Sequence, residues 1–193
     1  MKRISMKLSL TAMGMVMAAL LFVSRSEAAN PVNVDIRVSI NATKSLAVGS
    51  TIYNYGALGV NVSSVSSSIL VTNDSAALVE TYTIQGQNAA STQGGTAWTL
   101  ASSTGALDTY ALAAQFSNAQ PVNTDVAFTA DDLTTSAIVA TAGTLGNGTA
   151  GESGAAVSPT GGSNTRNLWF RIRTPVSVTD TTQRLATLTL AVQ

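Results

Sequence analysis

A strict alternation of apolar and polar residues near the end of the chain limits what this sequence can fold into. In residues 168–174 every second residue faces one side, and Trp169, Arg171 and Arg173 face the other. After a proline and a polar reversal, residues 186–192 repeat the pattern. A period of two with many β-branched residues indicates strands that bury one face. Both segments are therefore predicted to be strands of a half-buried sheet.

The segment at residues 32–40 shows the cleanest alternation of apolar and polar residues in the sequence. Its apolar face consists of Val32, Val34, Ile36, Val38 and Ile40. The simpler interpretation is an ordinary sandwich strand. The alternative is an assembly strand, donated to complete the sheet of a neighbouring subunit. Alternation alone does not separate these two interpretations.

Short strand candidates recur along the whole chain, including residues 58–62 and 126–128. Together they give about eight to ten strands separated by turn residues, and no sustained helical period follows the first 29 residues. Two packed antiparallel sheets, in an Ig-like or jelly-roll-like β-sandwich, bury such strands best. The glycine-rich residues 141–163 lack periodicity and are predicted to form a long mobile loop.

The first residues have the pattern of a secretory signal peptide. Lys2, Arg3 and Lys7 precede an apolar run, and Ser26 and Ala28 are the small residues required before a cleavage site. We therefore expect residues 1–28 to be removed and residues 29–193 to form a single domain. No later hydrophobic stretch is long enough to span a membrane as a helix. The expected location is extracellular or at the cell surface, with the periplasm as the alternative.

Residues 29–193 carry six positive and nine negative side chains, a net charge of −3. This balance gives no electrostatic basis for binding nucleic acid. The sequence has no histidine and no cysteine, which excludes Ser-His-Asp triads, cysteine nucleophiles and zinc sites built on these residues. We expect neither enzymatic activity nor a cofactor.

Asp125, Asp131 and Asp132 are close enough in sequence to collect a calcium ion. They do not form an Asp-x-Asp-x-Asp-Gly loop, so a solvated turn without metal is the favoured interpretation. The adjacent pair would direct its two side chains to opposite faces of an extended segment.

Four aromatic residues are candidates for contacting a ligand, because aromatic rings stack on sugar rings. They are Tyr53, Tyr55, Trp98 and Trp169. Trp169 lies opposite the apolar face of its strand and is the one most expected to be exposed. Packing at the edge of the core is the alternative role for the tyrosines.

Two pieces of the chain resemble WxL domains, secreted β domains that attach non-covalently to bacterial cell walls. One is the Trp-x-Leu motif formed by Trp98 and Leu100, and the other runs from Pro175 through the Thr/Leu segment at 184–190. The second Trp-x-Leu motif of that family is missing, because Leu190 stands where a tryptophan is expected. Only Trp98 and Leu100 therefore correspond to residues of the family motif.

These features predict a secreted, non-catalytic structural protein of the bacterial cell surface, a self-assembling subunit of a layer or fibre. The alternative is a module that binds the cell wall or a polysaccharide non-covalently. The expected partner is accordingly another copy of the chain or an envelope polysaccharide.

Overall fold

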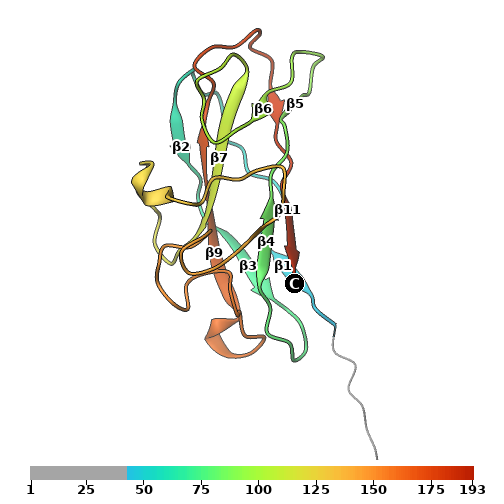
Figure 1. Cartoon of the computed structure of the whole chain (residues 1–193). Helices are drawn as coiled ribbons and strands as arrows, with labels where there is room; N and C mark the ends of the chain where they lie inside the picture. Colours follow the sequence, from blue (N-terminus) through green and yellow to red (C-terminus); the bar gives the residue numbers. More distant parts are fainter. Residues whose placement is uncertain (1–42) are drawn as a thin grey trace, which may run out of the picture. The chain divides into compact units, whose positions relative to one another are not determined.

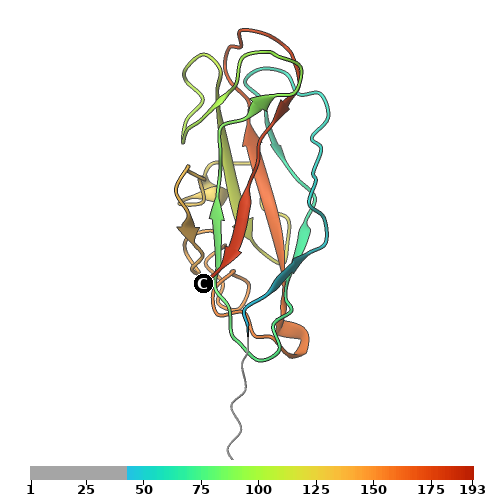
Figure 2. The same ribbon diagram turned by 90° about the vertical axis from the view of Figure 1, so that its right-hand side faces the viewer.

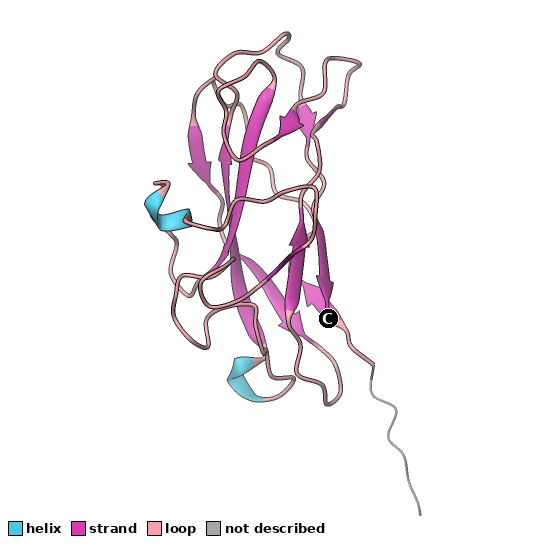
Figure 3. Cartoon of the chain, in the orientation of Figure 1, coloured by secondary structure: helices cyan, strands magenta, loops and turns pink. Residues whose placement is uncertain are grey.

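Strands supply nearly all regular structure in the computed structural model, which describes residues 43–193 (Figures 1 and 3). The predicted signal peptide and the predicted strand at residues 32–40 lie outside the described residues. None of the helices within residues 43–193 has the length and apolar character needed to cross a membrane.

The larger sheet is built around β9 (Thr165–Arg173), which pairs with three other strands. Its order is β1 (Leu46–Val48), β3 (Ile69–Asn73), β9, β7 (Thr109–Phe116) and β6 (Thr99–Leu100), and β2 (Ser63–Val65) pairs with the far half of β9. All pairs are antiparallel except β6 with β7. β9 is thus the centre of this layer.

Two smaller sheets complete the strands. One has the order β11 (Thr189–Val192), β4 (Tyr82–Gln85) and β8 (Ile138–Val139), and the other joins β10 (Arg184–Leu185) to β5 (Ala90–Ser91). Figure 2 shows β11 beside β4, in agreement with their antiparallel register. Within residues 43–193, two short 3-10 helices, η2 (Val126–Phe128) and η3 (Gly161–Ser163), lie in the connections.

The core forms between the inner faces of the sheets. Tyr82 and Ile84 of β4 and Phe116 of β7 are almost completely buried and belong to the same cluster. Leu168 and Phe170 of β9 join them, as the period-two pattern predicts. The inner face of the last segment also packs on this cluster, through Ala186, Leu188, Leu190 and Val192. The predicted all-β sandwich is confirmed.

Two of the predicted strands are wrong. Residues 58–62 form a turn in which Asn61 has a positive φ of 56° and donates its N–H to the carbonyl of Pro175 at 2.8 Å. Residues 126–128 form η2 instead, with the N–H of Ala127 bonded to the hydroxyl of Thr124 at 3.3 Å. A run of three apolar residues does not distinguish a strand from a helical turn.

The prediction of a mobile loop at residues 141–163 also needs correction. Leu145 and Val157 are fully buried in the core, and Val157 exchanges two backbone hydrogen bonds with Glu80. Gly154 lies so close to Phe116 that a Cβ atom there would be 2.5 Å from the ring. Close packing against Phe116 therefore explains why residue 154 is a glycine. Residues 141–163 form one wall of the core.

Candidate functional site

The two tyrosines form the only mutual aromatic pair among the four candidate ligand-contact residues in the described chain. The rings of Tyr53 and Tyr55 meet edge to face with centroids 4.7 Å apart. Tyr53 is 38% exposed. Tyr55 donates its hydroxyl to the carbonyl of Phe170 at 3.1 Å, and burial raises its pKa far above the ordinary value. Tyr55 thus anchors the pair, and Tyr53 presents the accessible ring.

The two tryptophans are half-buried, and the indole N–H of Trp98 has no hydrogen-bond partner among the described residues. Trp98 packs against the core, and the guanidinium of Arg184 lies 5.3 Å from the centre of its ring. Arg184 belongs to the closing segment, so its contact with Trp98 joins the two segments that resemble WxL domains, and it also donates to Asp180 at 2.8 Å. Trp169 donates its indole N–H to the carbonyl of Ser117 at 2.8 Å, which corrects the expectation of an exposed ring.

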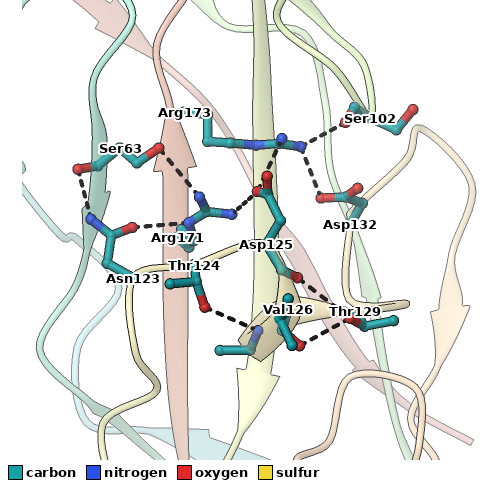
Figure 4. A network of polar contacts seen from close by, with 11 residues as sticks. Ser63, Ser102, Asn123, Thr124, Asp125, Val126, Thr129, Asp132, Arg171 and Arg173 are labelled. Carbon is teal, nitrogen blue, oxygen red and sulfur yellow. Dashed lines mark hydrogen bonds and ion pairs between the residues drawn. The ribbon is translucent and has the colours of Figure 1, made fainter.

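A network of arginines and aspartates lies on the outer face of β9 (Figure 4). Arg171 and Arg173 are two residues apart on one strand, so their side chains share a face. The Oδ1 atom of Asp125 accepts from Arg171 at 2.5 Å and from Arg173 at 3.2 Å. Arg173 also reaches Asp132 at 3.4 Å. The network therefore fastens the segment around η2 to the centre of the sheet.

These residues line a hollow of about 350 Å³. Hydrogen bonding to Arg171, with the charges of both arginines, holds the pKa of Asp125 below its usual range. The Nε atom of Arg171 donates to Asn123 at 2.9 Å, and Arg173 donates to the carbonyl of Ser102 at 2.6 Å. The guanidinium groups of Arg171 and Arg173 thus bind groups of the protein itself, so the network has the form of a structural contact between segments.

Asp131 turns away from this network into the interior. It is fully buried, and Gln115 donates to its Oδ2 atom at 2.7 Å. The backbone amides of Leu145 and Gly146 lie near the carboxyl group, but its Oδ1 atom forms no hydrogen bond of regular geometry. Burial raises the pKa of Asp131 to about 6, against the lowering effect of these donors. The interpretation of a solvated turn is therefore wrong for Asp131.

The three aspartates are not gathered into one site. Asp131 and Asp132 face opposite sides, as expected for an extended segment, and Asp132 joins Asp125 on Arg173. Within residues 43–193 no group of three or more acidic, histidine or cysteine side chains is placed to hold a metal ion.

The buried carboxyl of Asp131 leads to a prediction about stability and pH. Its pKa is raised in the folded protein from an ordinary 3.8 to about 6, so folding favours the protonated form. Unfolding free energy should therefore fall as pH rises through that window, by roughly 2–3 kcal/mol. Asp131→Asn should remove this fall, measured by urea unfolding between pH 4 and pH 7. Asp74→Asn, at an exposed position, is the control; an unchanged slope in Asp131→Asn would contradict the assignment.

The free edge of β11 is a feature that the sequence pattern did not single out. Thr81 and Gln193 exchange both backbone hydrogen bonds, at 3.5 and 3.0 Å. In an antiparallel ladder, hydrogen-bonded residue pairs alternate with pairs that are not hydrogen-bonded. Counting back from Gln193 by two residues at a time, Ala191 and Thr189 therefore also turn their backbone groups toward β4. Leu190 and Val192 therefore turn their backbone groups outward, and β11 is the edge strand of its sheet within residues 43–193.

Two of the usual devices that prevent strand pairing, charges and prolines, are missing from this edge, although β11 itself has only four residues. Residues 185–193, LATLTLAVQ, contain no charged residue and no proline. Natural edge strands are commonly protected by charges, prolines or bulges. The inner face of β11 is also only half-buried, whereas Tyr82 and Ile84 of the adjacent β4 are at most 1% exposed. The edge is thus both unpaired within the described residues and incompletely covered.

Comparison with protein-family models, with curated proteins and with solved structures finds no match for this chain. The likeness to WxL domains stays a prediction based on Trp98, Leu100 and the closing segment.

Proposed function

We propose that this chain is a secreted, non-catalytic structural protein of the bacterial cell surface, a subunit that assembles with copies of itself into a layer or fibre. The observation that carries the proposal is the open edge of β11. An uncharged edge with outward N–H and C=O groups is a template for adding a strand from another chain. The signal-like residues 1–28 support export, where such pairing takes place outside the cell.

The proposal is tested by electron microscopy and sedimentation of the exported protein over a wide concentration range. Ordered polymers are expected, and a strictly monomeric protein under physiological salt would overturn the proposal. Leu190→Pro should abolish the polymers, because proline removes an N–H that faces the open edge. Leu190→Ala is the matched control, since it loses a similar core contact but keeps the N–H. Both variants should melt cooperatively, and equal polymerisation of the two would exclude the β11 edge from assembly.

The tyrosine pair favours a second candidate function, non-covalent binding to a cell-wall or envelope polysaccharide. Tyr53 offers a partly exposed ring held at a fixed angle by Tyr55. In that case Tyr53→Ala should weaken binding to isolated walls about tenfold, the value of one lost stacking contact. Tyr53→Phe is the control that keeps the ring, and equal binding by all three proteins would exclude this pair as the binding site.

A further inference from the structure

We infer that residues 32–40 of a neighbouring copy of this chain form the strand that pairs with the open edge of β11. The inference deepens the proposed assembly function and depends on it. The occupant is thus a defined segment of a second copy rather than an unrelated protein.

The first argument is complementarity between the segment and the edge. The segment has five apolar residues on one face, which are buried only if the strand lies against a core. Beside β11 such a face would lie next to Leu188, Leu190 and Val192, which pack on the core but stay half-exposed. The outward backbone groups of Leu190 and Val192 would bond to the added strand.

The second argument concerns length and composition. Residues 186–192 keep the period-two pattern, and although only Thr189–Val192 pair as a strand, the apolar face of β11 continues at Ala186 and Leu188. The segment at residues 32–40 is longer in sequence than residues 186–192. Neither segment contains a proline, so no backbone donor is missing from either one.

The third argument concerns which molecule supplies the strand. Ser45 is held beside β4, with its N–H bonded to the carboxylate of Glu80 at 2.7 Å. In Figures 1 and 2 the first described residues, drawn in blue, lead from β1 past the C-terminal end of β11 and away from the strands. Residues 41–44 include neither glycine nor proline, and Asn41 is the one strong turn former among them, so the sequence offers little support for a tight reversal between residues 32–40 and β1. A neighbour's edge requires no such reversal.

The absence of natural cysteine allows a direct test with single cysteines. Exported chains carrying Arg37→Cys are mixed with tagged chains carrying Thr189→Cys, under mild oxidation, after each variant is shown to melt near the wild-type temperature. Both positions lie on the outer face of their segments, where neighbouring strands bring Cβ atoms within disulfide reach. Asp35→Cys and Ser39→Cys replace Arg37→Cys to scan the register. Val126→Cys, at an 85% exposed position, is the collision control.

We expect a disulfide-linked pair of one tagged and one untagged chain for at least one donor position. It should form on the order of 1,000-fold faster than with Val126→Cys, because assembly raises the local thiol concentration from micromolar to millimolar. A double variant, Arg37→Cys with Thr189→Cys, should yield a ladder of linked chains. A link only within single molecules would overturn the inference.

The outcomes separate the two proposals. Polymers without any link between the segment and Thr189 would leave the assembly function in place and overturn this inference. A protein that stays monomeric at every concentration would overturn the assembly function itself.

Discussion

Removing residues 146–154 is expected to leave a chain that does not fold. The carbonyl of Ser153 accepts the Nε–H of the buried Arg166 at 2.8 Å. The carbonyl of Gly154 accepts the backbone N–H of Tyr82, also at 2.8 Å. Each donor left unsatisfied in the interior costs ~1–3 kcal/mol.

The deletion would also displace the residues that flank it. Leu145 and Val157 are fully buried, and losing each burial costs ~1.5–3 kcal/mol. The combined cost is comparable to the ~5–15 kcal/mol that stabilises a typical domain. Circular dichroism should show no cooperative thermal transition in the deletion variant.

A shorter deletion provides the control. Residues 148–150 are exposed at the tip of the same segment, and loop-closure entropy changes slowly with length. Their removal should lower the melting temperature by only a few degrees. If the longer deletion behaved like the shorter one, the segment would not be part of the core.

Phe116→Ala is expected to destabilise the protein by about 3–5 kcal/mol, the usual cost of truncating a buried aromatic residue. Phe116 is fully buried between the sheets, and its ring lies 5.7 Å from that of Tyr82. It also contacts the backbone at Gly154, which cannot close the resulting cavity without moving a wall of the core. The loss is measured as a shift of the urea midpoint with an unchanged slope.

Val126→Ala is the matched control, because it removes apolar atoms from a side chain that is 85% exposed. Its unfolding free energy should stay within about 0.5 kcal/mol of the wild type. Similar losses in the two variants would mean that Phe116 is not at the centre of the core.

The parts of the fold that the sequence predicted are those with long, regular alternation. Residues 168–173 and 186–192 each present several apolar residues at the period of a strand, and the structure places both patterns against one core. Short segments were predicted less well, because three apolar residues fit a helical turn as readily as a strand. The sequence does not reveal that residues 141–163 are part of the core, because their buried residues are widely spaced. Leu145 and Val157 show no period, although both are completely buried.

The candidate site was harder to predict, because its features depend on neighbours that are distant in sequence. Nothing around Asp131 indicates that Gln115 and the amides near Leu145 enclose it. Whether β11 is a central or an edge strand depends on sheet order, which a single sequence does not reveal. The lack of charges and prolines in residues 185–193 was a readable signal, but it acquires meaning only once the edge is located.

The central position of β9 has a consequence for how the chain acquires its structure. β9 pairs with β2, β3 and β7, all of which precede it by long stretches of sequence. During synthesis β3 can pair only with the short β1 and β7 only with the two-residue β6, and the larger sheet is joined only when residue 165 and its successors emerge. Such non-local pairing slows folding, so the larger sheet cannot form until most of the chain has been synthesised. For the export proposed above this delay would be an advantage, because a chain that has not yet folded can still be threaded through a narrow membrane channel.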